Sequence, residues 1–203
     1  PYSDPLGKPL VPGTTLGFID PSVMIDDDGQ AWLFWGNNGL WYAPLGRDMV
    51  SLAGPVREVP GLNDPAAFGP MREKMDYASG RRMMKTNYEE GPWAFKRNGI
   101  YYLVYAAGGV PAHMAYSYAK DVNGPWTYGG RIIDESPGSF TIHGGSIEVA
   151  GRNFMFYHNG LAPNGGGFRR STTVEEFVWQ GDSLPFIPHT NGRPEKGIGH
   201  LNP

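Results

Sequence analysis

Residues 88–105 read YEEGPWAFKRNGIYYLVY, and this stretch carries the strongest structural signal in the chain. Asn98-Gly99 in its middle is typical of a two-residue hairpin turn, because both residues tolerate the positive φ that such a turn requires. The segment Tyr101–Tyr105 after the turn is rich in aromatic and β-branched residues, which favour strands. The stretch therefore predicts a β-hairpin, with the acidic pair Glu89-Glu90 near the beginning of its first strand.

The same pattern occurs three times, with copies that begin at Asp20, Glu90 and His143. In each copy a polar residue is followed by a strand, a turn glycine and a second strand. The polar residue precedes the turn glycine by nine positions in the first two copies and by eight in the third. Repeats of about 40–50 residues with several strands each are typical of propeller blades, which surround a central channel. The repeat therefore predicts that Asp20, Glu90 and His143 meet at one point.

The composition bounds the class of protein. The 203 residues suffice for one domain with a sizeable core, and 30 Gly and 19 Pro indicate a turn-rich all-β protein. A net charge of −3 gives no reason to expect nucleic acid or an anionic membrane as partner. The sequence has no run of 18 apolar residues, so no membrane-spanning helix is expected. Cysteine is absent, which excludes disulfides, thiolate metal sites and cysteine nucleophiles.

The pattern also divides the chain into segments. We expect three blades, at 17–59, 90–134 and 143–188, with a long loop at 60–88 between the first two. Residues 1–16 are expected to be the tail of a preceding blade, and residues 191–203 a linker toward a carbohydrate-binding module. Asp26–Gly29 reads as an acidic hairpin turn, since its spacing does not match an EF-hand calcium loop. Three blades do not close a ring, and open sheet edges are avoided. Either the chain is a piece of a longer polypeptide, or something else supplies the missing blades.

Two carboxylates and a histidine beside aromatic side chains suggest glycoside hydrolysis. That chemistry needs one carboxyl group protonated and another ionised, and a neighbouring carboxylate raises the pKa of the acid. Adjacent residues of a strand point to opposite faces, so only one of Glu89 and Glu90 can face the channel. The register with Asp20 selects Glu90.

Three sets of motifs resemble glycoside hydrolase family 43. The motif EGPW at 90–93, with KRNG at 96–99, looks like the family's general-acid blade. The motif FIDPSV at 18–23, with WGN at 35–37, looks like its second-carboxylate blade. The motif SFTIH at 139–143, with FYHNG at 156–160, looks like its central-histidine blade. The resemblance runs through nearly all of the chain and is greatest with the arabinoxylan arabinofuranohydrolase and β-xylosidase members.

The resemblance implies a five-bladed β-propeller, of which the chain covers roughly three to three and a half blades, with the first blade largely missing. It also implies an inverting mechanism in which Glu90 is the general acid and Asp20 the pKa modulator. The family's catalytic base, an Asp, lies on the first blade and is not matched here. Asp4 is not assigned to that role, because it precedes Asp20 by too few residues for a blade.

The resemblance further implies which residues contact the sugar. His143 corresponds to the channel histidine, which in many members contacts a central Ca²⁺ or its waters, so we expect a structural Ca²⁺ there and no cofactor for the chemistry. Arg170 corresponds to an arginine near the sugar pocket. Trp35, Trp93 and Phe140 are expected to contact substrate, although a tryptophan in a buried strand fits the core equally well.

The expected function is release of arabinofuranose or xylose from arabinoxylan or xylo-oligosaccharides by an extracellular enzyme. The sequence does not choose between arabinofuranoside and xyloside. A propeller that binds carbohydrate without cleaving it is the alternative. A sucrose- or fructan-acting enzyme on the same architecture is a third interpretation, which the context of Glu90 disfavours.

Overall fold

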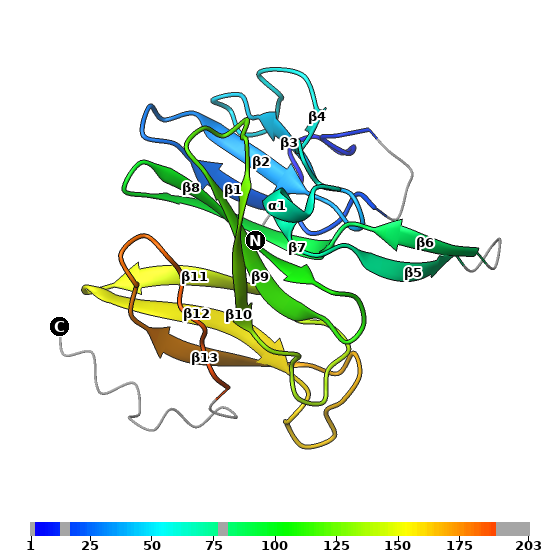
Figure 1. The fold of residues 1–203 in the computed structure, drawn as a ribbon. Coiled ribbons are helices and arrows are strands. Elements are labelled where there is room, and N and C mark those ends of the chain that lie inside the picture. Colours follow the sequence, from blue (N-terminus) through cyan, green and yellow to red (C-terminus); the bar gives the residue numbers. More distant parts are fainter. Residues whose placement is uncertain (1–2, 13–16, 77–80, 190–203) are drawn as a thin grey trace.

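Three antiparallel sheets follow one another along the chain in the computed structural model, which describes residues 3–12, 17–76 and 81–189 (Figure 1). The first sheet contains β1 (Ser22–Ile25), β2 (Ala31–Trp35), β3 (Trp41–Pro44) and β4 (Arg57–Glu58). The second contains β7 (Tyr88–Arg97), β8 (Ile100–Ala107), β9 (His113–Ala119) and β10 (Thr127–Ile133). The third contains β11 (Gly144–Val149), β12 (Arg152–Asn159) and β13 (Ser171–Phe177). In each sheet, neighbouring strands are consecutive in sequence, as expected when short turns connect antiparallel strands.

The predicted hairpin turns are confirmed. Asn98 has φ 52° and Gly99 has φ 74°, and the turn joins β7 to β8. Asp26–Gly29 forms the turn between β1 and β2, in which the Gly29 N–H donates to the Asp26 carbonyl at 2.9 Å. The local turn chemistry of the sequence therefore sets the register of both hairpins.

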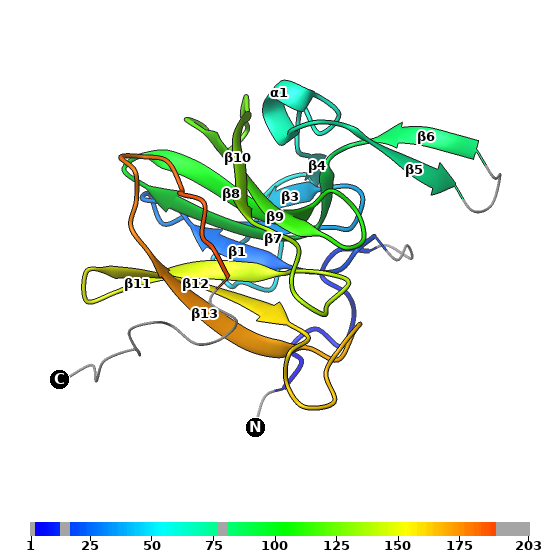
Figure 2. The same ribbon diagram turned by 60° about the horizontal axis from the view of Figure 1, so that its bottom comes forward.

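Residues 60–88 differ from the long loop that the sequence predicts. They contain the short helix α1 (Pro65–Phe68) and a hairpin of β5 (Arg72–Asp76) and β6 (Arg81–Lys85), and β7 already begins at Tyr88. The hairpin extends away from the three sheets in both ribbon views (Figure 2). Its charged residues have low strand propensity and no apolar alternation, so the pattern gives no strand signal there.

Strand β8 lies at the centre of the fold because both of its faces are buried. Tyr101, Leu103 and Tyr105 face a core that is shared with the first sheet. Tyr102 and Val104 point the opposite way, into a core that is shared with the third sheet. This alternation is what a strand between two sheets requires. The second sheet is therefore packed on both faces and holds the other two in place.

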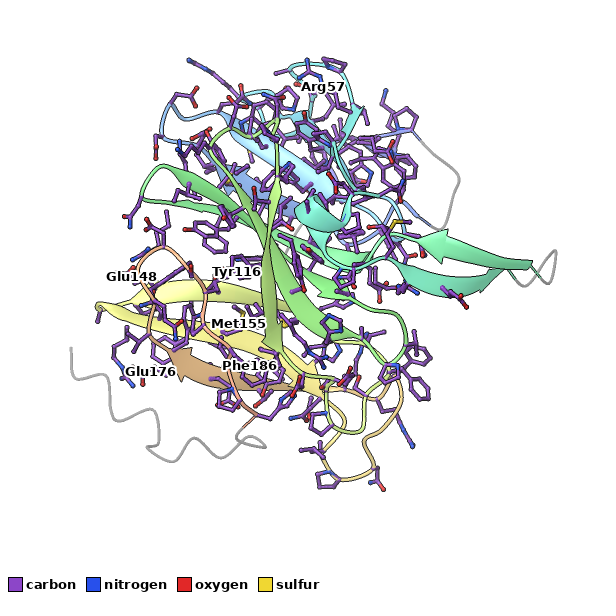
Figure 3. All side chains as sticks on the ribbon, viewed as in Figure 1. Arg57, Tyr116, Glu148, Met155, Glu176 and Phe186 are labelled. Atoms are coloured by element: carbon purple, nitrogen blue, oxygen red, sulfur yellow. The ribbon has the colours of Figure 1, made fainter. Side chains whose placement is uncertain are left out.

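The third sheet packs on the second through Met155 of β12, which is fully buried in a core that also contains Tyr116 of β9 (Figure 3). The first strands of the sheets also lie together, since β7 contacts both β1 and β11. This arrangement places the beginnings of three sheets around one region.

Of the two predicted end segments, only the N-terminal one lies partly among the described residues. Leu10 and Val11, in the segment predicted to be the tail of a preceding blade, pack on the outer side of the first sheet. The predicted linker at 191–203 lies outside the described residues. Within the described part of the chain, the structure has no helix long and apolar enough to cross a membrane.

We predict that Met155→Ala lowers the free energy of unfolding by about 2–5 kcal/mol, because it leaves a cavity between two sheets. Leu161→Ala serves as the control, since Leu161 is exposed and its truncation should cost less than about 1 kcal/mol. Urea denaturation followed by tryptophan fluorescence measures both. Equal costs for the two variants would contradict the packing described for the third sheet.

Candidate functional site

Asp20 lies just before β1 in an unusual backbone conformation. Its φ is 59°, in the left-handed region that residues other than glycine seldom adopt. The segment is held there because the Gly36 N–H donates to the Ile19 carbonyl at 2.9 Å. The Asp20 carboxylate accepts a hydrogen bond from the Gly91 N–H, while its Oδ2 is buried without a hydrogen-bond partner among the described residues. Strained backbone of this kind is typical of functional sites.

Glu90 lies on β7 between two interruptions of the strand register. The pairing with β8 shifts between Tyr88 and Glu90 and again between Glu90 and Trp93. Such bulges re-aim a side chain relative to regular alternation. Glu90 points toward Asp20, whereas the neighbouring Glu89 forms a buried ion pair with Arg72 of β5. The prediction that Glu90, and not Glu89, faces the site is confirmed.

Both carboxylate oxygens of Glu90 have a polar neighbour. Asn37, in the turn between β2 and β3, donates its amide N–H to Oε2 at 2.6 Å. His143, just before β11, places Nε2 3.0 Å from Oε1. One ligand atom each from Asp20, Glu90 and His143 lies within 4.8 Å of the others. The predicted meeting of these three side chains is confirmed, and their roles stay predictions.

Gly91 leaves room for the histidine. Its φ is 62°, and a Cβ at this position would approach Cγ of His143 to 2.9 Å. Any side chain would therefore be strained by its own backbone and would displace the imidazole. The sequence pattern does not mark Gly91 as a site residue, although Gly91 follows Glu90 directly.

His158 of β12 supports His143 from behind. Its Nδ1 accepts a hydrogen bond from the His143 backbone N–H at 3.4 Å, and its Nε2 lies 2.9 Å from the Thr141 carbonyl. Burial, reinforced by the positive charge of Arg170, lowers the pKa of His158 to about 4. The neutral ring can donate to one partner and accept from the other, which suits this position. Sequence reasoning includes His158 and Asn37 only as members of motifs, so both roles are missed.

Arg170 lies at the rim of the site. Its Nη1 donates to the Thr141 Oγ1 at 3.2 Å, and its charge acts to lower the pKa of both Asp20 and Glu90. Trp93 and His143 line a cavity of about 570 Å³ on the outer face of β11 and β12. The structure thus places Arg170 near both carboxylates and Trp93 near His143, while the predicted sugar contacts of Arg170 and Trp93 stay predictions.

The other predicted aromatic contacts differ from one another. Phe140 is half exposed, one residue before Thr141. Trp35 is only 4% exposed and packs in the core of the first sheet with Leu33 and Leu45. Its position is that of a core residue, the second of the two interpretations that the sequence leaves open.

The two carboxyl groups are biased in opposite directions. Burial raises the pKa of Asp20 above its ordinary value, and the charge of Glu90 adds to this effect. The hydrogen bond from His143 lowers the pKa of Glu90, and the hydrogen bond from Asn37 acts in the same direction. The expectation that the pKa of Glu90 is raised is therefore wrong for the described residues, because the hydrogen bonds on its two oxygens and the charge of Arg170 stabilise the anion more than burial destabilises it.

The donor set does not fit a calcium ion by itself. Ca²⁺ takes about six to eight oxygen ligands, whereas the described cluster offers two carboxylates and one imidazole nitrogen. The imidazole Nε2 already lies against Glu90. We therefore assign no metal ligand to His143 from these residues, and we derive no chemical step through a metal.

The chain resembles known proteins over most of its length. It is 29% identical to a β-D-galactofuranosidase, xynD, from Aspergillus niger, over 91% of this chain and 51% of that protein. It is 28% identical to the arabinoxylan arabinofuranohydrolase of Bacillus subtilis strain 168, over 100% of this chain and 42% of that protein. The chain thus spans about half the length of the curated relatives that it matches.

Solved structures share the fold. CoXyl43, a β-xylosidase/α-arabinofuranosidase from a compost microbial metagenome crystallised with xylotriose in a calcium-free form, superposes with a TM-score of 0.68 at 24% identity, covering 84% of this chain and 58% of that one. The sequence profile of glycosyl hydrolases family 43 matches residues 1–185. The chain is a member of glycoside hydrolase family 43.

Proposed function

We propose that residues 1–203 form the acid-bearing part of an extracellular glycosidase that releases arabinofuranose or xylose from arabinoxylan or xylo-oligosaccharides. The observation that carries this proposal is the cluster of Asp20, Glu90 and His143, whose ligand atoms lie within 4.8 Å of one another. Two relatives, a xylosidase/arabinosidase from Humicola insolens and the arabinoxylan arabinofuranohydrolase of Bacillus subtilis, support the choice of pentose substrates.

In this proposal Glu90 is the general acid. Its proton passes to the glycosidic oxygen as the bond to the anomeric carbon breaks. A water molecule adds to the opposite face of the sugar and gives its proton to the catalytic base. Asn37 and His143 hold the carboxyl group in one orientation through its two oxygens. Sugar binding excludes water from the site, and the resulting burial raises the pKa of Glu90 toward the protonated form.

Asp20 is the modulator in this proposal and not the base. An inverting pair needs its carboxyl groups about 6.5–9.5 Å apart, so that a water molecule fits between them. Asp20 and Glu90 have oxygens within 4.8 Å, which leaves no such space and suits two groups that influence each other's protonation. The base is then an Asp outside this chain, on the first blade of a five-bladed propeller of which the three sheets here are part.

We predict that Glu90→Gln in the full polypeptide lowers kcat on an unactivated pentose disaccharide at least about 100-fold, because the amide cannot donate the acid's proton. The loss should be smaller for an aryl pentoside with an acidic phenol, which leaves without protonation. Glu148→Gln, an exposed change on β11, is the matched control (Figure 3). Circular dichroism checks folding. Full activity of a folded Glu90→Gln protein on the disaccharide would remove Glu90 from the acid role.

We predict that Asp20→Asn shifts the basic limb of the kcat/KM profile to lower pH by about one unit. Activity of a general acid falls as pH rises through its pKa, and removing a neighbouring negative charge lowers that pKa. Asn keeps an oxygen that can accept from the Gly91 N–H, so the geometry is retained. Asp28→Asn, in the exposed turn after β1, is the control. A basic limb that stays in place in Asp20→Asn would argue against the modulator role.

A further inference from the structure

A tight turn near the site carries an exposed aromatic ring at its tip. Gly166 and Arg169 are joined by two backbone hydrogen bonds, of 3.0 and 2.9 Å, so that Gly167 and Phe168 occupy the two central positions. Gly167 has φ 60°, and Phe168 is not among the residues with positive φ. A positive φ at the first central position alone is the type II′ turn, which favours glycine there. Phe168 is thus presented by a well-defined turn.

The tip of this turn is held by a second segment of the chain. The Gly167 N–H donates to the Gly138 carbonyl at 2.8 Å, and the Gly167 carbonyl accepts from the Phe140 N–H at 3.3 Å. A Cβ on Gly167 would come within 3.3 Å of the Phe140 ring, which shows how closely the two segments approach. Both aromatic rings are therefore carried on hydrogen-bonded backbone.

The two rings face solvent instead of filling a core. Phe168 is 70% exposed and Phe140 is 50% exposed, and their rings meet edge to face with centroids 5.3 Å apart. The second central position of a type II′ turn does not require an aromatic side chain. The fold of the described residues therefore gives no reason for a phenylalanine at 168, whereas clustered exposed aromatics are typical of binding sites.

The pair of rings is continuous with the carboxylate site. Phe140 precedes Thr141, which accepts a hydrogen bond from Arg170, and Arg170 lies two residues after Phe168. Arg170 is also close enough to Glu90 to affect its protonation. Arg170 therefore connects the segment that carries the two rings with the segment that carries Glu90.

We propose that Phe168 and Phe140 form an aromatic platform for a second sugar unit of an oligosaccharide whose first unit lies at Glu90. This inference rests on the proposed function and adds to it a preference for oligosaccharides over single pentosides. The occupant is the apolar face of a neutral sugar ring, because the platform itself offers aromatic carbon and no charge. Such a contact contributes affinity without taking part in bond cleavage.

The test compares a long and a short substrate in the full polypeptide. Phe168→Ala should raise KM for xylotetraose about tenfold, the effect of losing one aromatic contact. It should change kcat/KM for an aryl pentoside, which has no second sugar, by less than about twofold. Phe168→Tyr should restore the value for xylotetraose, since a tyrosine ring offers the same face. Phe186→Ala is the matched control, because Phe186 is also a half-exposed phenylalanine but lies after β13 (Figure 3).

Several outcomes would overturn the platform. One is an equal loss on both substrates, above all with a lowered melting temperature, which would mean that Phe168 packs against another part of the polypeptide. Another is an unchanged KM for xylotetraose. Calorimetry of xylotetraose binding to Glu90→Gln protein, with and without Phe168→Ala, measures how much the platform contributes to affinity in the absence of turnover. If the polypeptide without substitutions shows no hydrolysis but Phe168→Ala still weakens binding of xylotetraose tenfold, the platform is supported and the proposed hydrolysis is not.

Discussion

A carboxylate that is mostly withdrawn from water, Glu90, sets the central constraint on this structure. Burying a charge costs free energy unless hydrogen bonds replace those to water. Each Glu90 oxygen has its own polar neighbour, and these come from different sheets, with Asn37 in the first and His143 at the start of the third. The three sheets must therefore keep their relative positions if both oxygens of Glu90 are to keep these polar neighbours. The packing of both faces of β8 provides this rigidity.

The backbone around the site is shaped for the same purpose. Asp20 and Gly91 both have positive φ, and the strand that carries Glu90 is bulged on either side of it. These features weaken the local structure, since strained residues and broken ladders each cost free energy. They bring two carboxyl groups and an imidazole within 4.8 Å, which regular strands with strict alternation would not do. Burial of apolar side chains in the two cores that flank β8 offsets this cost in free energy.

The sequence predicts the hairpins, the order of the sheets and the meeting of three polar residues, because each depends on local turn chemistry and on a repeated spacing. Asn98-Gly99 and Asp28-Gly29 specify their turns with little help from the rest of the chain. The hairpin of β5 and β6 is missed because charged residues carry no strand pattern. His158 and Asn37 are missed because their roles depend on which partner lies opposite them in space. The direction of the pKa shift at Glu90 is missed for the same reason, since hydrogen bonds from two spatial neighbours outweigh the effect of burial.

The polar residues around Glu90 come from all three sheets and the segments that connect them. Asp20, Asn37, Glu90, Gly91, His143 and Arg170 make their mutual contacts through residues of the three described sheets and their connections. The short distance between Asp20 and Glu90 makes them a coupled pair, in which a proton on one favours the anion on the other. Burial favours the proton on Asp20, and hydrogen bonds favour the anion on Glu90. The proposed acid role of Glu90 therefore requires that substrate reverses this preference, either by displacing water or by loosening the contact with His143.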